Sequence, residues 1–301
     1  MAGRSCQKSA VKATYWSAPV ALACHPRRMS RKSVRVTRAL QGISKATHTL
    51  TLRRYMFLHS AFSKLPEAQQ LFFIRVCLIS DDLRHLHHLM LQANVAINAT
   101  KGTEQLMALD QLIFALRIYY GTLNEAWEVV RTGWHGTQLA RHLHSSLSLD
   151  AKKAFENLSR YFSHENLTTK IRNNFAFHFS DKPIKKALKQ YPADAKDDFI
   201  SGEDSANTYY KFAEQVRRHA LVLETGDVDL ADADKVNGAV RKIYDEGLAR
   251  FDDFTAFFDD VMVTIAKQLN ATSEIFIPSL VGNIANATPI LFIDSDSIPQ
   301  S

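Results

Sequence analysis

The sequence predicts an all-α fold, an antiparallel bundle of four to six helices. Long segments carry apolar residues at alternating steps of three and four, the spacing of one face of a helix, and no segment between them alternates as a strand would. The 301 residues also contain only 11 Gly and 8 Pro, which is few for the turns of an all-β protein.

Three long helices are predicted, over about residues 67–97, 103–130 and 234–269. In the second, the apolar rhythm holds without a slip over eight positions, and Gly133 and Gly136 mark its end. These eight positions are Leu106, Leu109, Ile113, Leu116, Tyr120, Leu123, Trp127 and Val130.

Shorter elements are predicted between the second and third long helices. Residues 134–149 form a polar connector with room for one helical turn, and a helix begins near Ser148. A further helix covers 166–179, another has Pro183 in its first turn, and one more covers about 206–223 between two loops.

The positive charge is confined to the N-terminal segment. Residues 1–66 contain 13 Lys and Arg and no acid, so the remaining 24 of the 37 bases face 31 acids, a net charge of −7. Three interpretations of the segment stay open. It is a basic arm for nucleic acid, an organellar presequence, or upstream sequence translated from an early start codon, with Met29 and Met56 as later candidates.

Three regions follow from these patterns. Residues 1–55 lack a sustained apolar stripe and are predicted to be a disordered basic extension. Residues 56–270 form the helical bundle, and 271–301 form a C-terminal tail. The apolar run 275–293 contains two Pro, so it is predicted to be extended or to form short strands rather than to span a membrane.

Neither the cysteines nor the histidines predict a metal site. The three Cys residues share no metal-ligand spacing and imply no disulfide framework, so a reducing, cytoplasmic location is expected. "RHLHHL" contains His85, His87 and His88, and "RHLH" contains His142 and His144. No carboxylate or Cys completes either set, and both are predicted to lie on a solvated helix face or loop. No metal and no cofactor are predicted.

The stretch "KIRNNFAFHFSDKP", residues 170–183, is the strongest candidate site. On an ideal helix of about 100° per residue, Ile171, Phe175 and Phe179 form an apolar face with His178 in its middle. Arg172 flanks this face. A buried imidazole needs a partner, so His178 is either a satisfied core residue or part of a site at an interface.

Within this stretch, "RNNFAFH" resembles the signature of the HEPN superfamily, the higher eukaryote and prokaryote nucleotide-binding domains. That signature is an Arg, commonly followed by a polar residue, and then a His after four to six intervening residues. Arg172, Asn173 and His178 match it with five intervening residues. The order of two long helices before the motif also agrees, and the resemblance covers about residues 67–225.

The resemblance implies a metal-independent endoribonuclease, often a toxin or defence protein, in which two protomers face each other and both motifs line one cleft. The implied partners are an RNA substrate, a second copy through the motif face, and a cognate antitoxin. His178 suits acid–base catalysis, Arg172 suits bidentate phosphate binding, and Asn173 would orient a phosphate oxygen or a hydroxyl. On an ideal helix Arg172 and His178 are about 120° apart. Their convergence therefore requires the reach of Arg172, a local break, or the second protomer.

Two other functions remain open. The first is a non-catalytic helical bundle that binds RNA, a nucleotide or a protein partner, with the motif as scaffold. The second is a nucleic-acid-binding protein that acts through its basic arm, residues 1–55, in which case deleting the arm would abolish binding.

Overall fold

A computed structural model of the protein describes residues 52–177, 180–191, 199–201 and 209–276. Helices carry nearly all of its secondary structure, and the only sheet among these residues has two strands. The predicted all-α class is therefore confirmed. None of the helices in these ranges combines the length and the apolar composition that a membrane-spanning helix needs.

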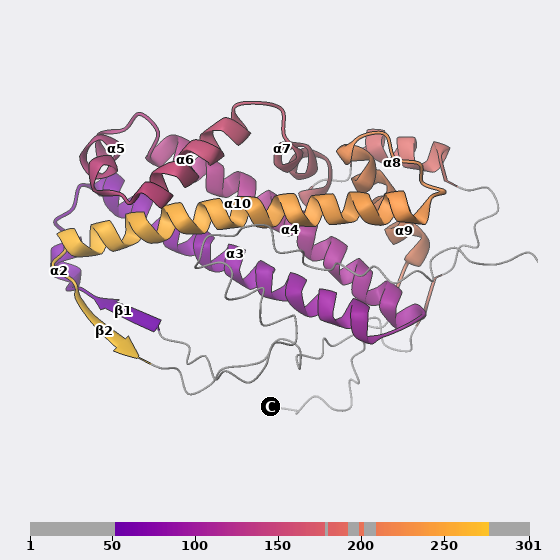
Figure 1. Ribbon diagram of the computed structural model, residues 1–301, viewed down its shortest axis with the longest axis horizontal. Coiled ribbons are helices and arrows are strands. Elements are labelled where there is room, and N and C mark those ends of the chain that lie inside the picture. The colour runs from indigo at the N-terminus through magenta and orange to yellow at the C-terminus, as the bar shows by residue number, and fades with distance from the viewer. Residues whose placement is uncertain (1–51, 178–179, 192–198, 202–208, 277–301) are drawn as a thin grey trace, which may run out of the picture.

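Three long helices build the body of the molecule, at the predicted places: α3 (Glu67–Ala99), α4 (Thr103–Gly133) and α10 (Ala233–Gln268). Helices α3 and α4 pack together as a hairpin, and the turn between them passes through Gly102, whose φ of 62° is unfavourable for any residue with a Cβ. Figure 1 shows α10 running the length of the bundle alongside this hairpin.

The connector after α4 is held by one buried aromatic residue. Trp134 is only 1% exposed and lies between Phe72 of α3 and Phe257 of α10, with ring centroids 5.9 and 5.2 Å away. The segment predicted to be a polar connector is thus anchored in the core at its first residue. It also contains two short helices, α5 (Gln138–Leu143) and η1 (His144–Ser146).

Side-chain caps fix the start of the next elements. Helix α6 (Leu149–Phe162) begins where predicted, because the hydroxyl of Ser148 accepts a hydrogen bond from the N–H of Ala151 at 3.2 Å. This helix packs along α10. The remaining elements of this half are α7 (Leu167–Ile171), η2 (Arg172–Ala176), α8 (Asp181–Lys189), α9 (Lys211–Val222) and η4 (Leu223–Thr225). Helices α8 and α9 pack together, while α7 and η2 lie on α4.

A small antiparallel sheet joins the two ends of the described chain. Strand β1 (Leu52–Met56) pairs with β2 (Thr272–Phe276), and α2 (His59–Phe62) follows β1. The predicted boundary at residue 55 therefore falls inside β1, and the C-terminal region begins with a strand. Residues 1–51 and 277–301, with most of the predicted extension and tail, lie outside the described residues.

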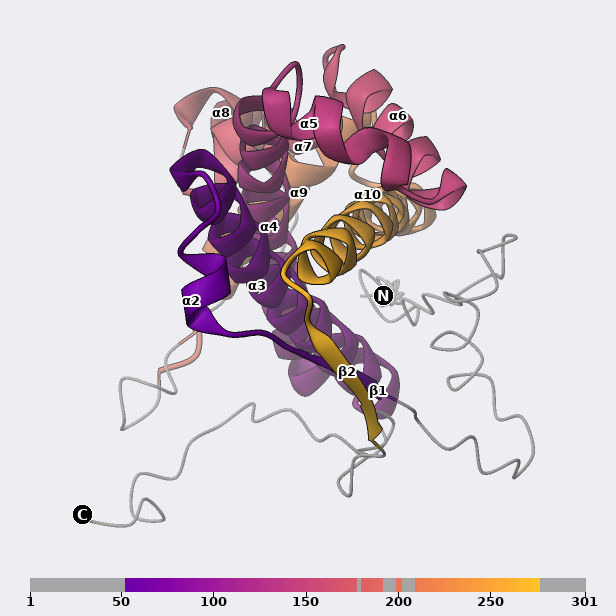
Figure 2. The same cartoon turned by 90° about the vertical axis from the view of Figure 1, so that its left-hand side faces the viewer.

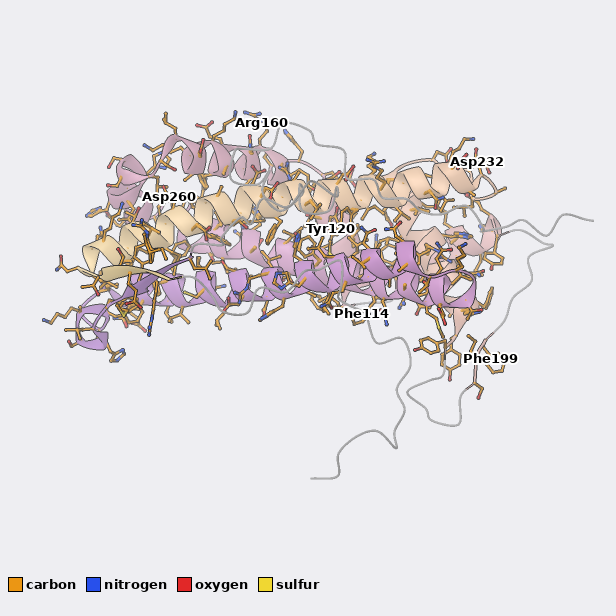
Figure 3. All side chains as sticks on the ribbon, turned by 60° about the horizontal axis from the view of Figure 1, so that its bottom comes forward. Phe114, Tyr120, Arg160, Phe199, Asp232 and Asp260 are labelled. Carbon is orange, nitrogen blue, oxygen red and sulfur yellow. The ribbon has the colours of Figure 1, made fainter. Side chains whose placement is uncertain are left out.

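The contact between α4 and α10 lies at the centre of the core. The hydroxyl of fully buried Tyr120 donates a hydrogen bond to the carbonyl of Ile243 at 2.6 Å. Gly247 leaves room for the ring, since a Cβ there would lie 3.3 Å from Tyr120 and from Tyr119. Figure 3 shows Tyr120 in the interior of the bundle, whereas Arg160 of α6 lies at its outer edge.

We predict that Tyr120→Phe lowers the free energy of unfolding by about 1 kcal/mol, the typical net value of one buried hydrogen bond. The loss stays small because the Ile243 carbonyl keeps its acceptor role within α10. Urea unfolding measures the change. Tyr210→Phe is the matched control, because Tyr210 is 66% exposed, and it should unfold at the parent's midpoint. Equal stability of the two variants would show that the Tyr120 hydroxyl does not join the helices energetically.

Candidate functional site

The candidate site begins with the short helix α7. The side-chain oxygen of Asn166 accepts a hydrogen bond from the N–H of Thr169 at 2.8 Å and caps its first turn. Leu167 and Ile171 are buried against the body. The α-helical part of the predicted helix 166–179 is therefore anchored at both ends, and it ends at Ile171.

The motif itself adopts a different helical form. Residues Arg172–Ala176 form a π-helical segment, η2, and Phe177 leaves the helix with φ −124° and ψ 0°. The prediction of one regular α-helix through this stretch is therefore wrong. The wider π-turn changes the angular positions of residues 172–176 relative to an ideal α-helix. Single π-turns of this kind are frequent at functional sites.

A glycine of α4 lets the motif approach the bundle closely. A Cβ at Gly121 would lie 2.7 Å from the ring of Phe177 and 3.0 Å from the Cβ of Ala176. Phe175 and Ala176 are buried on this side, whereas Phe177 remains 56% exposed. The segment thus packs directly against α4, and the ring of Phe177 remains partly exposed to solvent.

The structure brings Arg172 and Asn173 together at the surface. One Arg172 nitrogen, Nη1, donates a hydrogen bond to Oδ1 of Asn173 at 3.2 Å, and Nη2 lies 3.5 Å from Oε1 of Glu125 on α4. The Arg172 side chain is 37% exposed, so its guanidinium is held from two sides and still reaches solvent. The third motif residue, His178, lies outside the described residues.

A second carboxylate holds the other side of the segment. Nδ2 of Asn174 donates a hydrogen bond to Oε1 of Glu224 in η4 at 3.0 Å. Burial raises the pKa of Glu224, while the Asn174 hydrogen bond and the charges of Lys170 and Lys186 act in the opposite direction. Glu224 is therefore a carboxyl group whose proton affinity depends on the motif and its neighbouring lysines.

Sequence reasoning missed Gly121, Glu125 and Glu224. Glu125 is one of several charged residues in α4, so nothing in the sequence singles it out. Neither carboxylate is near the motif in sequence, because Glu125 precedes Arg172 by 47 residues and Glu224 follows Asn174 by 50. Tertiary packing brings them together.

The sequence predicted that the whole first histidine cluster lies on a solvated face, but the structure shows this for only two of its three histidines. His85 and His88 are exposed, but the ring of His87 stacks on Phe251 of α10 with centroids 4.8 Å apart. His87 thus belongs to the interface between α3 and α10. In the part of the chain that is described, no three His, Cys, Asp or Glu side chains are grouped as a metal site would require.

Comparisons with known proteins give no match to this chain. No family model, no curated protein and no solved structure resembles it significantly. A function must therefore be argued from the chain's own residues and their geometry.

The half-buried ring of His87 predicts how stability depends on pH. Burial, with the charge of His88 as a smaller cause, lowers the pKa of His87 from 6.5 to about 4. The unfolded chain therefore binds the proton more tightly than the folded one. The free energy of unfolding should be highest above about pH 6.5 and should fall as the pH drops towards 4. Urea unfolding across this range measures the decline.

A substitution separates His87 from the other acid-sensitive groups. His87→Phe keeps an aromatic ring against Phe251 and removes the proton-binding group, so its unfolding free energy should fall less steeply below pH 6.5. His142→Phe, at an exposed position of α5, should follow the parent curve. If both variants follow the parent curve, His87 does not contribute to the acid sensitivity.

Proposed function

We propose that the protein is a metal-independent endoribonuclease in which Arg172, Asn173 and His178 act on the RNA. The observation that supports this most directly is the pairing of Arg172 with Asn173 on a half-exposed π-turn. This pairing joins the first two residues of the HEPN-like signature in one place. Arg172 remains open to solvent, as a residue that binds a phosphate must be.

The chemistry follows from what RNA cleavage requires. The 2′-oxygen attacks the adjacent phosphorus and loses its proton to a base, the bond from phosphorus to the 5′-oxygen breaks, and an acid returns a proton to that oxygen. His178 serves as one of these proton carriers, since imidazole changes charge near neutral pH. Arg172 stabilises the negative charge on the phosphorane, and Asn173 orients a phosphate oxygen. The products are a 2′,3′-cyclic phosphate and a free 5′-hydroxyl.

The second proton carrier is supplied by another copy of the chain in this proposal. Two motifs that face each other across a twofold axis would provide two His178 side chains, one as base and one as acid. The proposed active form is therefore a homodimer through the motif face. A cognate antitoxin that covers this face would inhibit it, as expected for a toxin or defence nuclease.

A non-catalytic role is the second candidate, and one observation favours it. Both described side-chain contacts that the motif makes outside η2 are with carboxylates of the same chain, Arg172 with Glu125 and Asn174 with Glu224. Such contacts also suit a segment that only braces the bundle. In that case the protein binds RNA, a nucleotide or a protein partner without cleaving it.

We predict that the purified protein cleaves single-stranded RNA in the presence of a chelator and leaves 2′,3′-cyclic phosphate ends. His178→Ala should lower the rate roughly 10²–10⁴-fold through loss of acid–base catalysis. Arg172→Ala should have a comparable effect, and Arg172→Lys should rescue poorly, because a point charge cannot make the bidentate contact. Gel electrophoresis of labelled RNA and mass spectrometry of the ends measure these outcomes.

His178→Ala and Arg172→Ala should keep the parent's helix content and oligomeric state, which separates a chemical defect from a folding defect. His142→Ala, which removes an exposed histidine of α5, is the matched control and should cleave at the parent rate. Cleavage by His178→Ala at the parent rate would eliminate the catalytic role.

The contact between Arg172 and Glu125 tests whether Arg172 binds RNA or only stabilises the packing of the bundle. We predict that Glu125→Gln tightens RNA binding several-fold, because it frees the guanidinium from a competing carboxylate. Its effect on stability should stay below about 1 kcal/mol, since the ion pair is half-exposed. Glu128→Gln, which removes the partner of Arg131 one turn further along α4, is the control. A loss of stability without any change in RNA binding would favour the bracing role.

A further inference from the structure

The helix that follows the motif presents a row of lysines on one side. In α8, Pro183 and Ala187 are buried against the body. The four lysines of this helix are all exposed and lie within about 100° of its circumference. This lysine face consists of Lys182, Lys185, Lys186 and Lys189.

The lysine face lies next to the π-helical segment. The charge of Lys186 acts on Glu224, and Glu224 accepts the hydrogen bond from Asn174 of the motif. The N–H of Ser180, directly before α8, also donates to the carbonyl of Asn174 at 3.3 Å. In Figures 1 and 2, α7 and α8 lie on the same side of the bundle.

Few acids among the described residues contact this face. Within the described ranges, only Lys185 forms an ion pair, with Asp181 at 3.1 Å, and both side chains are more than two-thirds exposed. An exposed pair of this kind contributes little. Such a concentration of positive charge stands out in a chain that carries a net charge of −7 after residue 66. It suits a partner that carries regularly spaced negative charges.

A second observation points to the kind of partner. Phe177 is 56% exposed, yet its ring is fixed against Gly121 of α4. Gly121 and Glu125 are one helical turn apart, about 6 Å along α4, so the ring and the Arg172 guanidinium that contacts Glu125 lie against the same stretch of this helix. An exposed aromatic ring next to basic side chains is how proteins stack unpaired bases of a nucleic acid.

We infer that the lysine face of α8 and the ring of Phe177 form the surface that holds a single-stranded RNA substrate. The lysines contact consecutive phosphates, and Phe177 stacks on an unpaired base beside Arg172. The inference rests on the proposed function, because it describes how the same site holds its RNA. Single-stranded rather than duplex RNA is required, since the bases of a duplex are already stacked on one another.

The test measures binding in the His178→Ala background, so that the RNA stays intact. The probe is a fluorescent 12-nucleotide single-stranded RNA, and fluorescence anisotropy is recorded between 50 and 300 mM salt. Glutamine at all four positions of the lysine face should weaken binding at least about tenfold. It should also lower the slope of log Kd against log salt by about 0.7 for each lost phosphate contact.

The matched control replaces four other exposed lysines by glutamine and so removes the same charge. These are Lys64, Lys101, Lys153 and Lys267, which lie outside α8. For the ring, Phe177→Leu keeps an apolar contact with Gly121 and should weaken binding roughly 5–100-fold. Phe199→Leu is its control, because Phe199 is 68% exposed and lies at the periphery of the molecule in Figure 3.

The outcomes separate this inference from the proposed function. If the parent cleaves RNA while the lysine variant binds like its control, the inferred binding surface is wrong and the proposed nuclease activity is supported. If RNA binding depends on the lysine face and Phe177 but the parent cleaves nothing, the surface stands and the nuclease is wrong. Equal binding of duplex and single-stranded RNA overturns the stacking role of Phe177. No binding of either RNA overturns both proposals.

Discussion

The contact between α4 and α10 at Tyr120 is the interaction on which the rest of the structure depends. The Tyr120 hydroxyl bonds to the backbone of α10 at Ile243, and Gly247, one turn later, leaves space for the ring. This fixes the two helices against each other near the middle of the bundle. Helix α3 packs along α4, and α6 packs along α10, so this contact joins the α3–α4 hairpin to the α6–α10 pair.

The same turn of α4 also positions the candidate site. Tyr120 faces α10, and the next residue, Gly121, receives Ala176 and Phe177 of the motif. Glu125, one turn further, contacts Arg172. Any displacement of α4 relative to α10 would therefore move the surface on which the π-turn rests. The stability of the core and the geometry of the motif are coupled through adjacent residues of one helix.

Two carboxylates set the electrostatics of the motif. Glu125 and Glu224 bind the polar side chains on either side of the π-turn, while lysines of α8 lie beside it. The acids hold the polar side chains of the motif in place. In the proposed function, an RNA strand would compete with Glu125 for Arg172 and would be attracted by the lysines of α8. Under that proposal, positioning and binding use opposite charges at the same place.

The sequence by itself determined the long helices α3, α4 and α10, because the 3.6-residue period of an apolar face is a local property of the chain. It also placed the start of α6 at Ser148, since a helix cap involves only neighbouring residues. Only the tertiary structure decided the π-turn at Arg172, the burial of His87 against Phe251, and the pairing of β1 with β2. Each of these arises from contact between segments that are far apart in the sequence, and a local pattern carries no information about which distant segment will pack against it.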